Sequence, residues 1–430
     1  LRAVSRGRRL DLAVSAETRG ADDRTRRWIR EAAYGTVRLR GRLDHLLDHH
    51  VDRGLASVHS DVVDVLRLGA YQLLNMGSVP PYAAITEAVD QVRAVGRPGA
   101  AGLVTAVLRG LGREGGERER FPGLDEDPVG HLATWGSHPR WLVERWVERF
   151  GVEATEGLVH ANNRIPPVGV RPVGASTPGT LERARAALEF SGILVAASVP
   201  EAGVLILAES AQLEPAMSTV RLQVQDPGAA MVIVYAAPEG GAGEWYADLC
   251  AAPGGKAVAL AEGGNPVLAL DPSTPRLRLV RDTAVRLELP IFPVRGRGES
   301  PPVGSARLVL VDAPCSGTGT LRRHPDARWR LQPSDLGTFV RLQAGILEGA
   351  ARAVEIGGLL VYSTCTLEPE ENRLQVEDFL KRHPEFEMEP PEGWGSPQLG
   401  ESMNAGGFLE VLPQVQGHDG AFAARMRRVR

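Results

Sequence analysis

Cysteine, lysine and long apolar runs are all scarce in this chain of 430 residues. Its three cysteines are an odd number and lack the paired spacing of a zinc site, so neither a disulfide framework nor a bound metal is expected. No apolar run approaches the roughly 18–20 residues of a membrane helix, and the arginine-rich N-terminus lacks the apolar stretch of a signal peptide. We therefore expect a cytoplasmic protein in a reducing environment, without a membrane partner.

Arginine takes the place of lysine almost everywhere. Lys256 and Lys381 are the only lysines. Lys256 lies in a glycine-rich turn, and the choice of lysine there suggests a specific role, because the larger guanidinium of arginine would fill that space differently. The formal net charge of −4 does not indicate a polyanion partner. Arginines are nevertheless concentrated in residues 1–53, which fits either a nucleic-acid-binding face or a solvated helical surface.

The length and the apolar fraction of 43% indicate about two to four domains with buried cores. The first 113 residues have apolar residues at helical spacing, with one helix beginning near Ser60 or Asp61. Further helices are expected over residues 22–39, 43–51, 85–95 and 103–111, and the charged, glycine-rich residues 112–123 are typical of a linker. Residues 1–123 are therefore predicted to be a helical bundle.

The middle of the chain, residues 124–234, mixes helical and β-like patterns. Residues 141–161 are predicted to be one helix, in which Trp141 and Trp146 belong to the core rather than to a base-stacking platform. Further along, β-like runs surround one helical pattern. They cover residues 168–173, 204–207 and 219–224, around a helix at residues 181–190. We interpret this region as a helical linker followed by a small α+β module.

Strand and helix patterns alternate in the last domain, residues 235–430. Predicted strands cover residues 246–249, 266–270, 291–294, 308–311, 359–363 and 408–412, and predicted helices cover residues 274–287, 335–354 and 370–382. Such alternation indicates a mainly parallel sheet with helices on both faces. Ligands of these sheets bind beyond the carboxyl ends of the strands, so polar motifs at those ends are candidates for function.

The first of these strand ends is followed by a glycine-rich turn, Cys250-Ala251-Ala252-Pro253-Gly254-Gly255-Lys256. A strand, a glycine-rich turn and a helix in succession are typical of a nucleotide-binding unit, although the spacing is neither that of a dinucleotide fingerprint nor that of a phosphate loop. Asp271 ends the next strand, about where a ribose-binding carboxylate is expected. The pattern therefore favours an adenosine-type ligand without a required pyrophosphate.

Two cysteines follow other strands of the same sheet. Cys315 lies just after Asp312, and Cys365 closes the run 359–363, so both are expected to face the adenosine site. A thiolate is the best side-chain nucleophile near neutral pH, which suggests covalent catalysis. A buried cysteine is more often a small apolar residue, but polar and glycine neighbours after both strands favour reactivity. A disulfide switch is also compatible with the pattern.

At this point the motifs resemble those of RNA cytosine-C5 methyltransferases. The C-terminal motifs are Asp312-Ala313-Pro314-Cys315-Ser316-Gly317-Thr318-Gly319, Arg322-Arg323-His324-Pro325-Asp326, Ser363-Thr364-Cys365-Thr366 and Pro369-Glu370-Glu371-Asn372. The N-terminal third resembles a NusB-like RNA-binding domain in Tyr34-Gly35-Thr36-Val37-Arg38, Leu68-Gly69-Ala70-Tyr71-Gln72-Leu73 and Ala101-Gly102-Leu103-Val104. Over nearly the whole chain, this combination is similar to the Sun/RsmB (Fmu) family of 16S rRNA methyltransferases.

The resemblance implies a multidomain fold: an all-α NusB-like bundle, a small α+β RNA-binding module and an α/β, Rossmann-like class I methyltransferase domain. It implies that Cys365 attacks C6 of a cytosine, which makes C5 electron-rich enough to be methylated. Cys315 would assist loss of the C5 proton and release of the enzyme. Asp312 would hydrogen-bond the N3/N4 edge of the base, in a role like that of an oxyanion hole.

The same resemblance implies S-adenosylmethionine as the cofactor and RNA, in particular 16S rRNA, as the partner of a monomeric enzyme. The cofactor-binding residues would be Cys250, Ala251, Ala252, Pro253, Gly254, Gly255, Lys256, Asp271, Arg276, Arg297 and Asp312. Arg322, Arg323 and His324 would contact the RNA backbone. The target base would have to be unpaired or extruded to be reached at C5 and C6.

The sequence departs from the family pattern at Arg297, where an acidic residue is usual, and at Arg171-Pro172-Val173, where the family has Arg-x-Asn. Neither change removes a catalytic group. Two alternatives remain open at this point. One is the same chemistry on tRNA or 23S rRNA, and the other is a non-catalytic RNA-binding adaptor. Intact Asp312, Cys315 and Cys365 favour an enzyme.

Overall fold

A computed structural model describes residues 1–174, 177, 179–209, 211, 213–239, 241, 243–391 and 402–430. The chain divides into two compact units. The N-terminal unit comprises Leu1–Ile165 together with Leu321–Leu331, and the C-terminal unit comprises Pro166–Thr320 together with Gln332–Arg430. Within these described residues, no helix is long and apolar enough to cross a membrane.

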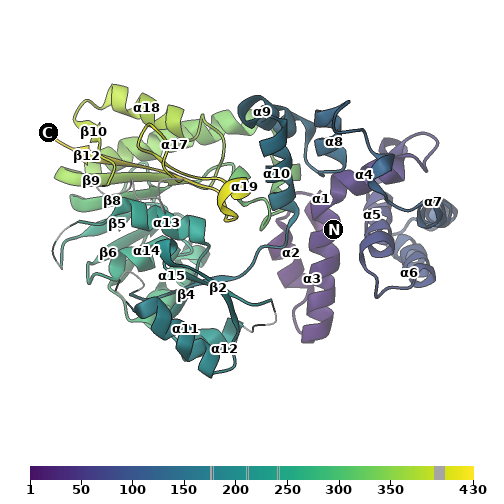
Figure 1. Ribbon diagram of the computed structural model, residues 1–430, viewed down its shortest axis with the longest axis horizontal. Coiled ribbons are helices and arrows are strands. Elements are labelled where there is room, and N and C mark those ends of the chain that lie inside the picture. The colour runs from purple at the N-terminus through teal and green to yellow at the C-terminus, as the bar shows by residue number, and fades with distance from the viewer. Residues whose placement is uncertain are drawn as a thin grey trace. The chain divides into compact units, whose positions relative to one another are not determined.

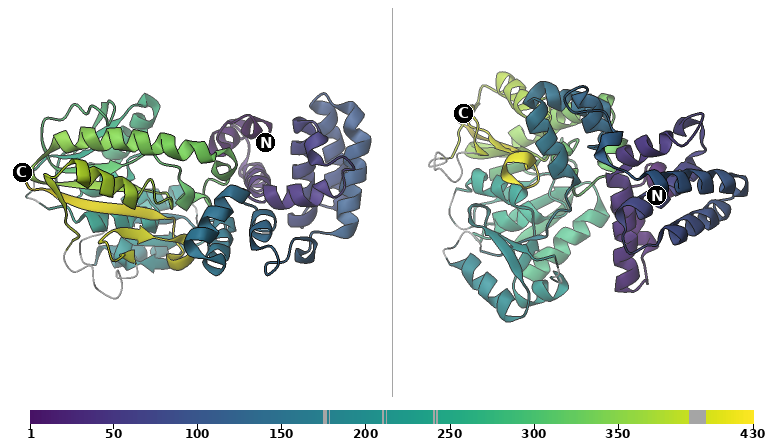
Figure 2. Two further views of the ribbon diagram at one scale, coloured as in Figure 1. Left: turned by 90° about the horizontal axis from the view of Figure 1, so that it is seen from above. Right: turned by 45° about the vertical axis from the view of Figure 1, so that its right-hand side comes forward.

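The N-terminal unit is built from helices packed around one apolar core (Figures 1 and 2). The helices expected in residues 22–111 are present. In chain order the helices before Ile165 are α1 (Arg2–Ser5), α2 (Leu10–Glu17), α3 (Asp23–Arg38), α4 (Arg40–Asp48), α5 (Ser60–Asn75), α6 (Pro81–Ala94), α7 (Ala101–Glu114), α8 (Pro128–Thr134), α9 (Arg140–Phe150) and α10 (Val152–Asn163). Leu43, Leu66 and Leu108 lie at the centre of the core and are fully buried.

The prediction of a single helix over residues 141–161 is wrong, because the segment contains two helices, α9 and α10. Gly151 separates them with a φ of +79°, a left-handed conformation that glycine adopts readily and that ends a helix. Trp146 of α9 is 1% exposed, as expected for a core residue. Its ring meets the edge of the buried His138 ring, with 5.6 Å between the centroids.

The C-terminal unit contains a small antiparallel sheet with the strand order β2-β3-β1-β4 among the described residues. The strands are β1 (Gly169–Pro172), β2 (Val195–Val199), β3 (Val204–Leu207) and β4 (Leu222–Val224), accompanied by helices α11 (Thr180–Phe190) and α12 (Leu213–Thr219). The strand expected over residues 219–224 is shorter, because Thr219 ends α12. β2 was not expected, since its three middle residues are all exposed and hide the alternation of a strand.

The larger sheet of this unit has the order β10-β12-β9-β8-β5-β6-β7 in the described part of the chain, with β11 paired to β12. Its strands are β5 (Tyr246–Asp248), β6 (Val267–Asp271), β7 (Ile291–Arg295), β8 (Ala306–Asp312), β9 (Val354–Thr364), β10 (Phe386–Met388), β11 (Leu409–Val411) and β12 (Ala421–Arg428). The five strands from β9 to β7 are mutually parallel, and β12 runs antiparallel to β9. The expected mainly parallel sheet is therefore confirmed.

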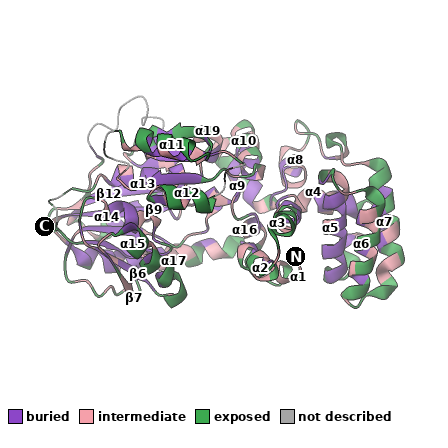
Figure 3. Cartoon of the chain, turned by 90° about the horizontal axis from the view of Figure 1, so that it is seen from below, coloured by how far each residue is buried: buried purple, intermediate pink, exposed green. Residues whose placement is uncertain are grey.

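Helices cover both faces of this sheet (Figure 1). One face packs against α13 (Pro227–Ala236), α14 (Gly255–Ala261) and α15 (Thr274–Leu287), and the other packs against α17 (Pro333–Ala353) and α18 (Arg373–Arg382). Figure 3 shows the strands buried between helices whose outer faces are exposed. The parallel strands β5, β6, β8 and β9 all end at the same edge of the sheet, where Asp248, Asp271, Asp312 and Thr364 lie.

Candidate active site at the carboxyl end of the sheet

The pairing of β8 with β9 brings two cysteines together. Asp312 lies opposite Ser363 in the parallel register, so the turns that follow the two strands leave the sheet at the same level. The Sγ atoms of Cys315 and Cys365 are 3.5 Å apart, and both residues are partly exposed. The proximity expected from the strand pattern is therefore present, and the two thiols can share one proton.

The two thiols have different proton affinities. The contact with Cys315 lowers the pKa of Cys365, and the nearby ammonium group of Lys256 acts in the same direction. The same thiol contact, together with burial, raises the pKa of Cys315 well above its ordinary value. Cys365 is therefore more often the thiolate that can act as the nucleophile, and Cys315, once deprotonated, is the stronger base of the pair.

Asp312 is held beside the cysteines by two polar contacts. Lys256 Nζ lies 2.8 Å from Asp312 Oδ2, and Ser363 Oγ donates to Asp312 Oδ1 over 2.9 Å. Burial alone would lower the pKa of Lys256, but its contact with Asp312 raises it, so Lys256 stays charged. The lysine of the glycine-rich turn thus connects that turn to the end of β8.

The glycine-rich turn connects β5 to α14 and is fixed by its strand neighbours. The amide of Ala251 donates to Leu270 O over 2.8 Å, and Gly254 has a φ of +111°, which favours glycine. Asp248, at the start of the turn, is fully buried and accepts only from the amide of Cys250, over 3.3 Å. Within the described residues its Oδ2 has no hydrogen-bond partner, and burial raises the pKa of Asp248 to about 7.

Asp271 ends β6 next to the same turn and is 2% exposed. Its Oδ1 accepts from the amide of Ser273 over 2.8 Å, and its Oδ2 pairs with the guanidinium of Arg276 over 3.1 Å. Arg276 also donates to the carbonyl oxygen of Ala252. Arg276 therefore links the second strand end to the glycine-rich turn, and both predicted residues lie together.

These residues fit a nucleoside cofactor with a cationic amino-acid group. The carboxyl groups of Asp248 and Asp271 are acceptors for hydroxyl and ammonium donors, although Oδ2 of Asp248 is enclosed and has no partner among the described residues. A Cβ atom built on Gly255 would meet no other atom closer than 3.6 Å, so a ligand can approach the backbone closely here. In the described residues no group of three or more His, Cys, Asp or Glu side chains could hold a metal ion.

Arg297 lies apart from this buried cluster. Its side chain is 78% exposed, and its guanidinium is 3.9 Å from the carboxylate of Glu299. An arginine cannot accept the hydrogen bonds that an acidic side chain accepts, so the departure from the family pattern at this position is a difference in charge. A role of Arg297 in cofactor binding stays a prediction.

The three predicted RNA-contact residues lie in Leu321–Leu331, which belongs to the N-terminal unit. Arg322 is 5% exposed and its carbonyl oxygen accepts from Arg38, whereas Arg323 is half-buried and His324 is exposed. Sequence reasoning missed Arg328 in the same segment. Arg328 is fully buried, donates to Ser137 O over 3.0 Å, and anchors the segment among the helices of its unit.

Sequence reasoning also quoted Glu371 in a motif without giving it a role. Glu371 is fully buried and accepts from the backbone amide of Ser316, the residue after Cys315. Its signal was present in the Pro369-Glu370-Glu371-Asn372 motif, but the contact depends on the pairing of β8 with β9, which joins residues far apart in the sequence.

Comparison with known proteins gives three matches to family models. Residues 236–427 match the model described as 16S rRNA methyltransferase RsmB/F. Residues 3–113 match the NusB family. Residues 138–212 match the ferredoxin-like domain of RsmF/B-like methyltransferases. These matches confirm the expected helical NusB-like region, the small α+β module and the Rossmann-like methyltransferase fold.

Relatives are similar over nearly their full length. The probable ribosomal RNA small subunit methyltransferase B of Bacillus subtilis is 33% identical over 94% of this chain and 91% of the relative. The ribosomal RNA small subunit methyltransferase B of Escherichia coli (strain SMS-3-5) is 31% identical over 98% of this chain and 95% of the relative. The solved structure of PH0851 has a TM-score of 0.76 and 24% identity, and the match covers 95% of this chain and 91% of that chain, which shows a common fold.

Proposed function

Because the chain belongs to the RsmB/F family of 16S rRNA methyltransferases, we propose that it methylates C5 of a cytosine in 16S rRNA through a covalent bond between Cys365 and C6. The chain is an S-adenosylmethionine-dependent rRNA methyltransferase, as the family establishes. The choice of base, the carbon that is methylated and the covalent adduct are the proposed part. One observation supports them above all, the distance of 3.5 Å between the sulfurs of Cys315 and Cys365.

A nucleophile is needed because C5 of cytosine is too electron-poor to accept a methyl group unaided. The Cys365 thiolate attacks C6, the S–C6 bond forms, and the electron pair of the C5=C6 bond becomes available at C5. The lowered pKa of Cys365 favours the thiolate that this step requires. Asp312, held by Lys256 and Ser363, hydrogen-bonds the N3/N4 edge of the base and stabilises the adduct.

S-adenosylmethionine, when bound, supplies an electrophilic methyl group for C5. Residues Cys250–Lys256 would hold its methionine part, with the carboxyl group of Asp248 as an acceptor for the ammonium group. Asp271, fixed by Arg276, would accept from the ribose hydroxyl groups. Afterwards Cys315, which gives its proton to water once Cys365 is bonded to C6, takes the C5 proton as a thiolate, the C5=C6 bond re-forms, and the Cys365 thiolate leaves C6.

RNA recognition is assigned to the other parts of the chain. The NusB-family match over residues 3–113 and the ferredoxin-like match over residues 138–212 support RNA-binding roles for both regions. The half-buried Arg323 and the exposed His324 are the better candidates for contact with the RNA backbone, because Arg322 is buried. The target base would have to leave its stack to reach both sulfurs.

The proposal is tested by bisulfite sequencing of 16S rRNA after incubation with the full chain and S-adenosylmethionine. One or more cytosines protected from conversion are expected with the wild-type protein, and none with Cys365→Ala. Methyl transfer without protected cytosines would contradict C5 chemistry, and protection retained in Cys365→Ala would remove Cys365 as the nucleophile.

Calorimetry with S-adenosylmethionine separates this enzyme from an RNA-binding adaptor. The wild-type protein and Cys365→Ala are both expected to bind the cofactor, because Cys365 is outside the glycine-rich turn. A protein that binds 16S rRNA but shows no cofactor heat would be an adaptor, and the catalytic proposal would fail.

A further inference from the structure

The buried carboxylate of Glu371 is hydrogen-bonded to the turn that carries Cys315. Oε1 of Glu371 accepts from the backbone amide of Ser316 over 2.9 Å and from Nε2 of Gln343 over 3.0 Å. The hydroxyl of Ser316 donates to the other carboxylate oxygen. Glu371 and Gln343 are both fully buried, so neither side chain exchanges these partners for bulk water.

Gln343 extends the same contact to the other side of Cys315. It lies on α17, and its Nε2 also donates to the carbonyl oxygen of Pro314 over 3.0 Å. The peptide groups before and after Cys315 are therefore both hydrogen-bonded, one to Gln343 and one to Glu371. We call this pair of side chains the Glu371–Gln343 clamp.

The clamp is also connected to the turn that carries Cys365. The hydroxyl groups of Ser316 and Thr366 are 2.6 Å apart, which joins the residues that follow the two cysteines. Tyr362 of β9 donates its hydroxyl to the carbonyl oxygen of Glu371 over 2.6 Å. Glu371 therefore has contacts to the elements that hold both sulfurs, and its loss would change the position of one relative to the other.

The burial of this carboxylate has to be explained, because it opposes folding. Burial raises the pKa of Glu371, which shows that the charged form is disfavoured there. A buried charge is often less favourable for stability than a well-packed apolar side chain of similar size. A stabilising function alone would therefore be served better by a methionine or leucine, whereas an apolar side chain could not accept from the amide and hydroxyl of Ser316.

We propose that Glu371 is a positioning residue for Cys315, which through the Glu371–Gln343 clamp holds the Cys315 sulfur where, as a thiolate, it can take the C5 proton after methylation. Glu371 does not itself touch the base, and it acts through the backbone of residues 314–316. The inference rests on the proposed function. It adds a residue that is required for enzyme release more than for attack on C6.

The release step explains what loss of the clamp would do. Once Cys365 is bonded to C6, the Cys315 thiol gives its proton to water and becomes a thiolate. The C5–H bond then breaks, the proton passes to the Cys315 thiolate, the electron pair re-forms the C5=C6 bond, and the S–C6 bond breaks with Cys365 leaving as thiolate. If the Cys315 thiol is displaced, the S–C6 bond still forms and C5 is still methylated, but the proton is not removed. The enzyme then remains covalently attached to methylated RNA.

Glu371→Ala is tested by denaturing electrophoresis after incubation of the full chain with 16S rRNA and S-adenosylmethionine, beside Cys315→Ala. Both variants are expected to accumulate an RNA–protein adduct that wild type does not, and the turnover of Glu371→Ala is expected to fall about a hundredfold with little change in KM. Glu371→Gln keeps an acceptor for Ser316 N and Gln343 Nε2, so it is expected to lose less than about tenfold, as for one neutral hydrogen bond. Glu377→Gln, in an exposed ion pair with Arg373 on α18, is the matched control and should release RNA normally.

The outcomes separate the two proposals. An adduct in Cys315→Ala and none in Glu371→Ala would overturn the role of Glu371, and no adduct in either variant with normal turnover would overturn the release role of Cys315. Calorimetry with S-adenosylmethionine reports folding of each variant. If Glu371→Ala does not bind the cofactor, Gln343→Met decides instead, since it removes the donor to Pro314 O from the other side of the clamp; normal release in that variant would contradict the inference.

Discussion

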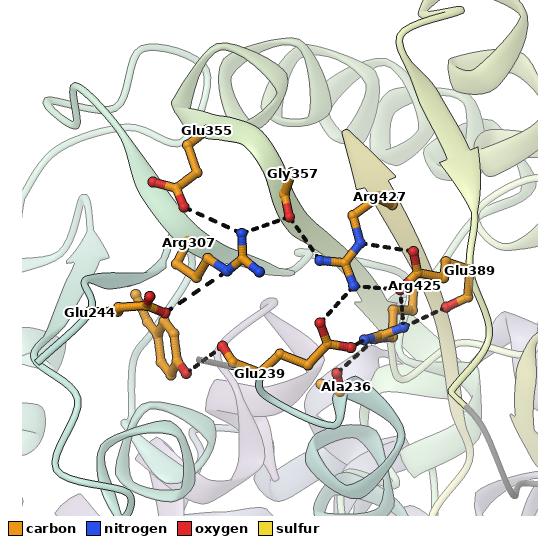
Figure 4. Close-up of polar contacts among 10 residues, drawn as sticks. Ala236, Glu239, Glu244, Arg307, Glu355, Gly357, Glu389, Arg425 and Arg427 are labelled. Atoms are coloured by element: carbon orange, nitrogen blue, oxygen red, sulfur yellow. Dashed lines mark hydrogen bonds and ion pairs between the residues drawn. The ribbon is translucent and has the colours of Figure 1, made fainter. Parts of the chain in front are cut away.

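The two ends of the large sheet both contain charged side chains, but they use them differently. At the amino end of β8 and β9, the guanidinium groups of Arg307, Arg425 and Arg427 alternate with glutamates (Figure 4). Arg425 is 2% exposed, and lies 2.8 Å from Glu389 and in contact with Glu239. At the carboxyl end, by contrast, the buried Asp248 keeps an oxygen without a described partner.

The two ends of the sheet also shift the pKa of their carboxyl groups in opposite directions. Hydrogen bonds from Arg427 lower the pKa of Glu389, so pairing there favours the charged state. Burial raises the pKa of Asp248 to about 7, so the charged state is disfavoured at the other end. A cluster whose charges are paired with opposite charges stabilises the fold, whereas a buried carboxylate without a charged partner favours binding of a cationic or hydroxyl group. Four substitutions test this division.

The largest expected effect is at the carboxyl end, on the reaction. Asp312→Asn weakens the contact with Lys256 and the hydrogen bond to the base, and is expected to reduce kcat/KM about a thousandfold, or roughly 4 kcal/mol. The measurement is methyl incorporation into 16S rRNA at several substrate concentrations. Glu389→Gln at the amino end is the control and should leave the rate per folded molecule unchanged. Equal losses in both variants would contradict the division.

Asp248→Asn should change how stability depends on pH. The pKa of Asp248 is about 7 in the folded chain and near 3.8 in the unfolded one, so the folded state binds the extra proton and wild type loses stability as pH rises from about 4 to 7. The variant lacks this loss, which amounts to roughly 4 kcal/mol at most. Urea unfolding at pH 5 and pH 8 measures it.

The control for that experiment is Asp282→Asn, an exposed residue paired with Arg281. Asp282→Asn is expected to follow the wild-type pH dependence. If Asp248→Asn also follows it, Asp248 is ionised in the folded protein at pH 5, and the carboxyl end does not hold a disfavoured charge.

Arg425→Met tests the amino end through stability. It removes the donor to Ala236 O, 3.1 Å away, and to Glu389 O, 2.8 Å away, and leaves Glu239 and Glu389 with Arg427 as their only remaining cation among the described residues. We expect a loss of about 3 kcal/mol in the free energy of unfolding, at the lower end for a broken buried pair because the glutamates are partly exposed. Methylation per folded molecule should not change. A variant that is stable but inactive would show that this end takes part in the reaction.

The same contrast explains which features could be predicted from the sequence. The strand ends with Asp271, Cys315 and Cys365 follow from short apolar runs that end in polar residues, because a strand that is buried on both faces is a nearly continuous apolar run. β12 was not expected, because its residues 421–428 include Arg425 and Arg427. An arginine in a buried strand breaks the polarity pattern, and only its distant glutamate partners make the burial favourable.

Long-range contacts account for the other misses. Leu321–Leu331 lies within the residues that match the methyltransferase model, and it packs as part of the N-terminal compact unit. Arg328 is buried there because carbonyl oxygens from Ser137 and Asn162 accept from it. The break at Gly151 was a local signal that the helical periodicity on both sides concealed. The role of Glu371 required the pairing of two motifs that lie 55 residues apart.

The smallest effect on stability is expected for Glu355, an exposed member of the cluster at the amino end of β9. Glu355 is 41% exposed and lies 3.6 Å from Arg307, which keeps its hydrogen bond to Gly357 O over 2.8 Å when the carboxylate is lost. Glu355→Gln should therefore change the free energy of unfolding by less than about 1 kcal/mol, and less still in high salt. Urea unfolding beside Arg425→Met gives the comparison. A loss in Glu355→Gln as large as that in Arg425→Met would mean that the whole network acts as one unit, and that exposure does not decide which of its ion pairs stabilise the sheet.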